Sequence, residues 1–194
     1  GALWYGVPQM LGQINMGPIL AQPLGAMVGL PLMTHQLGYF NILPLYIALL
    51  VFTPLMLMVA VRRPWWLLCG SIALWMLAGQ FRLNFPNFPT RGGWFFNPLS
   101  WQLIFVVGLL SGTAMKQGTR FVPIKPWLFW AATAMLVFIL AWVKIDALGA
   151  AGRSVLDLLS RAGLPFYVTW FDKTFLALPR LLHALALVYV LSCL

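Results

Sequence analysis

Two ionisable side chains near the end of the chain have types and a spacing that suit chemistry within a membrane. Arg180 and His183 are three positions apart, so a helix would place them on one face. His183 falls well inside an apolar run, where an ionisable group is costly and usually functional. Its imidazole could transfer a proton or donate a hydrogen bond, held by Arg180 or by a substrate carboxylate. The structural alternative is a neutral histidine that bonds a backbone carbonyl near the helix end.

A second group of polar residues stands at the start of the run WFFNPLSWQLIFVVGLLSG, residues 94–112. Asn97, Trp101 and Gln102 could hydrogen-bond a sugar hydroxyl or an acyl carbonyl, while the indole offers carbohydrate a flat apolar surface. Each also has a structural interpretation: Asn97 as a helix cap, Trp101 as an interfacial anchor and Gln102 as an interhelical hydrogen bond. Gln102 is the strongest of the three for substrate binding.

Helical spacing places several residues of this run on one stripe, which we expect to face the interior of a bundle. The stripe comprises Asn97, Trp101, Phe105, Gly108 and Gly112. Glycines four apart let a neighbouring backbone approach closely in membranes. We expect Gln102, Arg180 and His183 to converge on one chamber beside this stripe.

Two further candidates have weaker signals. The segment FNILPLY, Phe40 to Tyr46, repeats the arrangement of a polar residue and a proline at the start of an apolar run. Asn41 and Tyr46 are therefore expected to join the same chamber. Asp172 and Lys173 open the triplet DKT, which we interpret as ordering a loop.

The composition indicates which class of protein positions these side chains. Hydrophobic residues make up 62% of the 194 residues and charged residues 8%, so we expect an integral membrane protein. The net charge of +9 comes from Lys and Arg in the short segments between apolar runs, which membrane topology explains without a nucleic-acid partner. The chain has no Glu, and its two cysteines lie inside apolar runs, so we expect no metal site and no pair of catalytic carboxylates.

The apolar runs predict an all-α fold, a multi-pass transmembrane helix bundle of about five to six spans. The clearest span is Ile42 to Val61, whose uncharged residues are ended by Arg62 and Arg63. The other expected spans are Trp65 to Phe81, Pro98 to about Met115, Pro126 to Val143, one beginning near Leu181, and a kinked one between Ile14 and Met33.

The segments between the spans predict sidedness. Prolines, asparagines and glycines make Leu83 to Phe96 an ordered loop on the membrane surface. Val155 to Leu164 predicts a short amphipathic helix at the interface. The connections Arg62 to Arg63 and Lys116 to Lys125 are short, basic and free of acids, so we expect them to face the cytoplasm. The loop before Pro98 and the segment that contains Asp146, Asp157 and Asp172 are then expected to face the periplasm.

Three stretches carry a resemblance to a known family: residues 94–112, HQLGYFNILPLYIALL from His35 to Leu50, and DKTFLALPRLLHALALVYV from Asp172 to Val190. In them the chain resembles the OpgC-type membrane acyltransferases, which add succinyl groups to osmoregulated periplasmic glucans, within the wider acyltransferase-three superfamily. The resemblance covers roughly residues 31–194, and Phe175 stands where the family usually has Asn.

The resemblance implies one integral-membrane acyltransferase domain over residues 1–194, the C-terminal part of a longer chain and cut off at its end. It implies a multi-pass protein of the bacterial inner membrane, surrounded by lipid, that transfers succinyl from succinyl-CoA to a hydroxyl of a periplasmic glucan without a bound cofactor. The superfamily's catalytic histidine belongs to an early helix, paired with an arginine, and is expected upstream of this sequence. Arg180 would then bind substrate and His183 would support catalysis.

A multi-pass transporter or flippase for a glycan or lipid-linked substrate is the alternative. An intramembrane His and Gln beside proline-broken helices would also suit a substrate pathway. Such a protein should show paired, inverted broken spans, and the sequence shows no convincing internal symmetry. A structural membrane subunit is a third possibility, which the polar stripe disfavours.

Overall fold

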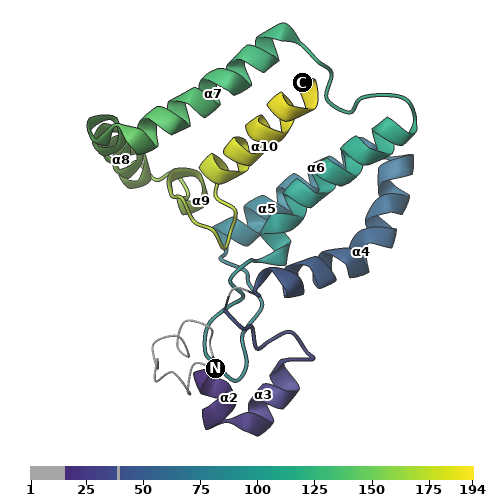
Figure 1. Ribbon diagram of the computed structural model, residues 1–194, viewed down its shortest axis with the longest axis vertical. Coiled ribbons are helices and arrows are strands. Elements are labelled where there is room, and N and C mark those ends of the chain that lie inside the picture. Colours follow the sequence, from purple (N-terminus) through teal and green to yellow (C-terminus); the bar gives the residue numbers. More distant parts are fainter. Residues whose placement is uncertain (1–15, 39) are drawn as a thin grey trace.

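The computed structural model describes residues 16–38 and 40–194, and these fold as helices without a strand, apart from an isolated bridge between Pro86 and Gly93 (Figure 1). The all-α prediction is thereby confirmed. In chain order the helices are α2 (Gly17–Ala21), α3 (Pro23–Gly29), α4 (Ile42–Arg62), α5 (Pro64–Gln80), α6 (Pro98–Lys116), α7 (Pro126–Lys144), α8 (Asp146–Arg161), α9 (Phe166–Thr169) and α10 (Leu178–Cys193).

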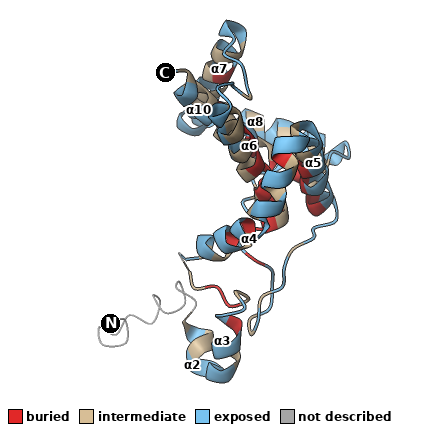
Figure 2. Ribbon diagram, turned by 90° about the vertical axis from the view of Figure 1, so that its right-hand side faces the viewer, coloured by how far each residue is buried: buried red, intermediate tan, exposed pale blue. Residues whose placement is uncertain are grey.

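The longer helices form two groups. Helices α4, α5 and α6 pack against one another, and α7 packs along α10 (Figure 1). Buried residues are concentrated in α5 and α6, whereas α7 and α10 are mostly exposed or half-buried (Figure 2). One hydrophobic core joins the two groups at the end where α6 and α10 begin. It comprises Trp75, Leu103, Tyr167, Leu176 and Leu181.

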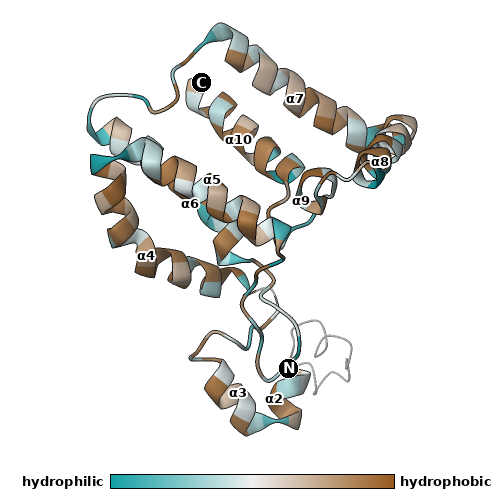
Figure 3. Ribbon diagram, turned by 180° about the vertical axis from the view of Figure 1, so that it is seen from behind, coloured by the Kyte–Doolittle hydropathy of each residue, from teal (hydrophilic) through white to brown (hydrophobic). Residues whose placement is uncertain are grey.

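Three of the described helices, α4, α6 and α7, are long and apolar enough to cross a membrane. Helices α4 and α7 are predominantly hydrophobic (Figure 3), yet only 11% of the apolar part of α4 and 6% of that of α7 is buried. An apolar surface of this extent is stable against lipid and unstable against water. The fold is that of a membrane protein. Helices α5 and α10 are shorter, with 17 and 16 residues. The described residues therefore contain three helices of full span length, and the predicted count of five to six spans is not confirmed.

Helices α4, α5, α6 and α7 match four predicted spans to within one residue at each end. Larger shifts occur at the starts of α10 and α8. Helix α10 begins at Leu178 rather than Leu181, because Pro179 fits the first helical turn, where its missing N–H is not needed. The amphipathic helix begins at Asp146 rather than Val155, since Asp146 favours a helix N-terminus and no proline follows it before Arg161.

The kinked span predicted between Ile14 and Met33 is wrong for the residues that the structure describes. They form the short helices α2 and α3, which Gln22 separates, and Ile14 lies outside the described residues. Pro18 and Pro23 each stand in a first helical turn, so each proline starts a helix instead of bending a longer one. A bend does occur in α4, which contains Pro54 and is visibly curved in Figure 1.

The inward stripe predicted for α6 is partly wrong. Gly108 and Gly112 are exposed, and a Cβ added to either would meet no other atom within 4 Å. The buried face is rotated by about one residue, because α6 packs between α4 and α5 through a different set of side chains. These include Gln102, Leu103, Val106 and Leu110.

The connections that were predicted to share one side of the membrane lie at the same end of the bundle. Trp65, at the start of α5, contacts Phe121 of the α6–α7 connection, with ring centroids 5.5 Å apart. In the same connection, Arg120 donates from Nη2 to the carbonyl of Ser192 at 3.0 Å. Helices α4, α6 and α10 all begin at the opposite end (Figure 1).

Candidate functional site

The loop of residues 172–177, between α9 and α10, is fixed by N–H donors from α5 and from the start of α6. The Trp75 Nε1–H donates to the carbonyls of Phe175 at 3.2 Å and Leu176 at 3.1 Å. The Trp101 Nε1–H donates to the carbonyl of Lys173 at 2.9 Å. The backbone N–H of Asn97 donates to the carbonyl of Thr174 at 3.1 Å. Four consecutive carbonyls are thus bound by the two helices, and the loop in turn sets the start of α10.

Within the loop, Asp172 plays the ordering role predicted for the DKT triplet. Its Oδ1 accepts from the backbone N–H of Phe175 at 2.8 Å, and its carbonyl accepts from Ala177 at 3.1 Å. Leu176 has a φ of 46°, in the left-handed region that a leucine seldom adopts, and is 2% exposed. Such a conformation persists only where surrounding contacts enforce it, and the Trp75 indole supplies one of them.

Two guanidinium groups border this loop, which with them forms the site we call the aromatic junction. Arg180, half-buried in the first turn of α10, donates from Nε to the carbonyl of Phe171 at 2.8 Å. Its terminal nitrogens have no ion pair or hydrogen bond to any described residue, so they are available to an anionic group. The guanidinium of Arg82 lies 4.5 Å above the ring centroid of Phe166, whose ring also contacts that of Phe175.

His183 lies one turn after Arg180 on α10, as the spacing predicted, but it is exposed in the described structure. Its ring has no hydrogen-bond partner among the described residues. The bond to a backbone carbonyl that the structural alternative expects is therefore not formed among the described residues.

Asn97 and Trp101 have their polar atoms engaged in the fold. Asn97 is fully buried, and its Oδ1 accepts from Leu99 at 3.0 Å, which confirms the predicted helix cap. Its Nδ2 donates to the carbonyl of Leu83, which ties the loop before α6 to that helix. The indole N–H of Trp101 is bound to the loop described above, and its ring makes an edge contact with Phe96 at 5.0 Å.

Gln102 makes the interhelical hydrogen bonds that were its structural interpretation. Its Oε1 accepts from the hydroxyl of Ser71, and its Nε2 donates to the carbonyls of Ser71 and Leu99. The expected convergence of Gln102 with Arg180 and His183 is not found. Gln102 is turned towards α5, where a buried amide must find partners, whereas Arg180 bonds Phe171 and His183 is exposed.

Asn41 and Tyr46 lie at the start of α4. Asn41 occupies the N-cap position without a side-chain cap bond, and Tyr46 is 49% exposed. They lie at the end of the bundle where α6 and α10 also begin (Figure 1). No hydrogen bond joins either side chain to the junction residues among those the structure describes.

Sequence reasoning missed three residues that the structure singles out. Ser71 and Trp75 lie inside an apolar run, and only the helix packing shows what they bind. His35 is 2% exposed, and neither of its ring nitrogens has a hydrogen-bond partner among the described residues. A Cβ on Gly29 would come within 2.9 Å of the Cβ of His35, so glycine is needed there for this burial. The available signal was the place of His35 in the stretch that carries the family resemblance.

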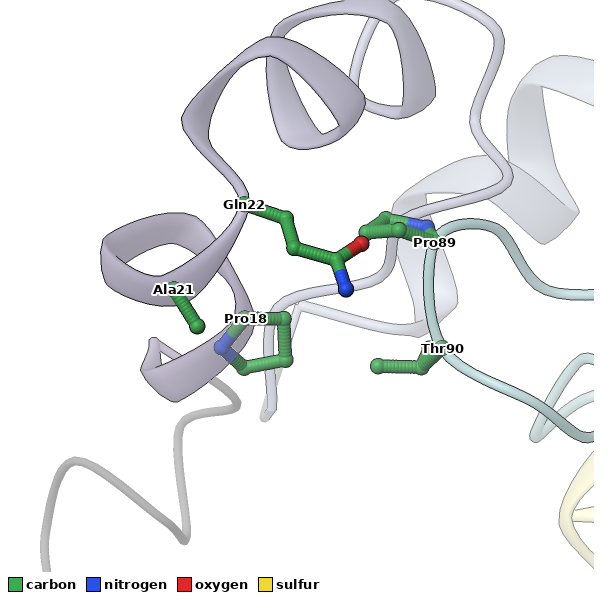
Figure 4. Close-up of a pocket in the computed structure, with 5 residues that line it drawn as sticks. All are labelled: Pro18, Ala21, Gln22, Pro89 and Thr90. Atoms are coloured by element: carbon green, nitrogen blue, oxygen red, sulfur yellow. The ribbon is translucent and has the colours of Figure 1, made fainter.

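An open hollow of about 260 Å³ lies apart from these groups, between α2 and the loop before α6. Figure 4 shows the side chain of Gln22 extending across it. None of the predicted site residues contributes to its lining, which consists of Pro18, Ala21, Gln22, Pro89 and Thr90. The described residues also contain no group of three or more His, Cys, Asp or Glu side chains that could hold a metal ion.

Comparisons with known proteins give a family. No curated protein and no solved structure matches the chain significantly. The family described as OpgC protein matches all of residues 1–194, including the stretches that form the aromatic junction. This chain belongs to the OpgC protein family.

Proposed function

We propose that this protein is a multi-pass O-acyltransferase of the bacterial inner membrane, which transfers succinyl groups from succinyl-CoA to hydroxyls of osmoregulated periplasmic glucans. The observation that carries the proposal is the family match over the whole chain. The apolar, outward-facing helices support the membrane location, and the basic connections at one end support the sidedness. The aromatic junction then lies at the periplasmic end, where the acceptor is found.

The reaction joins a glucan hydroxyl oxygen to the acyl carbon and breaks the thioester C–S bond. The hydroxyl proton leaves to a base, and the departing CoA thiolate is protonated. The chemistry therefore needs a base near the hydroxyl and a group that holds the succinyl carboxylate. The principal base belongs to the early helix that the family resemblance implies.

In this proposal Arg180 pairs with the succinyl carboxylate through its terminal nitrogens, because its Nε is already held by Phe171. His183, on the same face of α10, supports proton transfer at the hydroxyl. Asn97 and Trp101 hold the loop of the site at the start of α6, and Gln102 acts only indirectly, by fixing α6 against α5. Asn41 and Tyr46 contact the glucan at the start of α4.

Membranes containing the complete protein test this directly. They are supplied with labelled succinyl-CoA and purified glucan, and the expected result is labelled ester that requires both the protein and the glucan. Movement of glucan across sealed vesicles without ester would contradict the proposal and favour a transporter.

His183→Ala tests the site within the same assay. Because His183 is exposed, the variant should insert and fold normally, and loss of a supporting acid–base group lowers the rate by about 10²-fold or more. Leu187→Ala, also exposed and one turn further along α10, is the matched control and should retain activity. Equal rates in both variants would remove His183 from the site.

A further inference from the structure

Helix α8 leaves the end of a membrane-spanning helix in a different direction. Helix α7 ends at Lys144, and α8 begins at Asp146 after a single residue. In Figure 1 α8 is seen nearly end-on, whereas α7 and α10 lie across the view, so α8 runs crosswise to both. Helix α7 has the length and hydropathy of a span, so α8 starts where that apolar helix ends.

One face of α8 is packed closely onto α7. A Cβ on Gly149 would lie 2.9 Å from the carbonyl oxygen of Trp142, and one on Gly152 would overlap the Trp142 ring. Because the two glycines have no side chains, the end of α7 can pack directly against α8, and this contact fixes the crosswise direction of α8.

The rest of α8 is divided between two exposed faces. Helical spacing puts Val155 and Leu158 on one side, where they are 54% and 66% exposed. It puts Arg153, Asp157 and Arg161 on the other side, where Asp157 and Arg161 form an ion pair at 2.7 Å. Figure 3 shows both hydrophobic and hydrophilic colours on this helix.

We propose that α8 lies in the headgroup layer of the membrane, with Val155 and Leu158 in the outer part of the acyl chains and Arg153 and Arg161 among the lipid phosphates. The partner is the phospholipid surface itself. Continuity favours lipid over a protein partner, because the exposed apolar surface of α7 extends to Val143, which is 69% exposed and three residues before α8 begins. An apolar face of this kind is buried about 5–10 Å below the headgroup level. This inference is independent of acyl transfer.

Site-specific labelling tests the placement. Cys69 and Cys193 are replaced by serine in the complete protein, and an environment-sensitive fluorophore is attached at Val155→Cys, Leu158→Cys or, as the matched control, Arg153→Cys. Each variant is reconstituted in phosphatidylcholine–phosphatidylglycerol vesicles. Quenching is then measured with lipids that carry a nitroxide high on the acyl chain and with iodide in the water.

The apolar positions should be quenched severalfold more by the nitroxide lipid than by iodide, and position 153 should show the reverse order. Strong iodide quenching at 155 and 158 would overturn the proposal, because the face would then lie in water. Protection from both quenchers would overturn it as well, because protein would then cover the face. Using two apolar positions keeps the test decisive if one variant fails to insert.

Discussion

The side-chain amide of Gln102 binds Ser71 twice: Oε1 accepts from the serine hydroxyl at 2.6 Å, and Nε2 donates to the serine carbonyl at 2.9 Å. Both side chains are buried at the contact between α5 and α6. The pair therefore connects two helices that otherwise meet through apolar side chains. Hydrogen bonds of this kind hold helices together in lipid, where apolar burial gives no preference for a neighbouring helix over the lipid.

The first prediction concerns the strength of that connection. A double-mutant cycle with Gln102→Leu and Ser71→Ala should give a coupling of about 0.6–1.7 kcal/mol in the free energy of unfolding, measured in mixed micelles. Ser111→Ala is the control, because its hydroxyl bonds Val107 within α6, and it should show no coupling to Gln102. Because Ser71→Ala keeps the backbone carbonyl, the cycle measures the bond of the Ser71 hydroxyl to Gln102, and a coupling of zero would mean that this bond is not formed.

The second prediction concerns the contact between α5 and α9. A Cβ on Gly79 would come within 2.7 Å of the Tyr167 ring, so Gly79→Ala should lower the free energy of unfolding by about 1–3 kcal/mol through overpacking. Gly70, in the same helix, has nothing within 4 Å of an added Cβ, and Gly70→Ala should be neutral or stabilising by up to about 1 kcal/mol. Equal effects at the two positions would show that α9 does not pack on α5.

The third prediction concerns the hydrogen bonds between Trp75 and the loop of residues 172–177. Trp75→Phe keeps a smaller aromatic side chain but leaves the carbonyls of Phe175 and Leu176 without this donor, at a cost of about 1–3 kcal/mol. Local opening of the loop should then increase, so trypsin should cleave after the exposed Lys173 more rapidly.

Trp66→Phe is the matched control for this change. Trp66 belongs to the same helix but is 76% exposed, and its replacement should leave the cleavage rate unaltered. Unchanged cleavage in Trp75→Phe would show that other contacts suffice to hold the loop.

The helices were largely predictable because a membrane span is recognised from the composition of its own stretch of sequence. Apolar length marked α4, α6 and α7, and Asn97 before Pro98 marked the start of α6. Hydropathy does not report which face of an apolar helix meets its neighbour, since both lipid and protein accept the same side chains. The prediction therefore put Gly108 and Gly112 inside, while the structure buries Val106 and Leu110.

The sequence correctly places Arg180 and His183 on one helix, but it does not predict how the candidate residues are arranged. Arg180 and His183 both lie on α10, as predicted. Gln102 was expected to face the same chamber, but its side chain bonds Ser71 instead. Polar side chains in an apolar run look alike in sequence whether they bind a substrate or a neighbouring helix. The distinction depends on long-range pairing, such as the contact of Trp75 with residues 175 and 176, which no local pattern encodes.

The fourth prediction concerns His35, whose buried ring has no hydrogen-bond partner among the described residues. Replacing an unsatisfied buried polar group by an apolar one of similar size is neutral or stabilising, so His35→Leu should leave the free energy of unfolding unchanged or raise it by about 1–3 kcal/mol. The acyl transfer proposed above should nevertheless fall, because a buried imidazole without a hydrogen-bond partner is costly to keep unless it has a functional role. Thr34→Val is the neighbouring control: its hydroxyl bonds Gly29 at 3.3 Å, and its loss should lower stability by about 0.5–1.5 kcal/mol without a specific loss of transfer. If His35→Leu proves less stable than Thr34→Val, the imidazole has a structural partner and its burial needs no functional explanation.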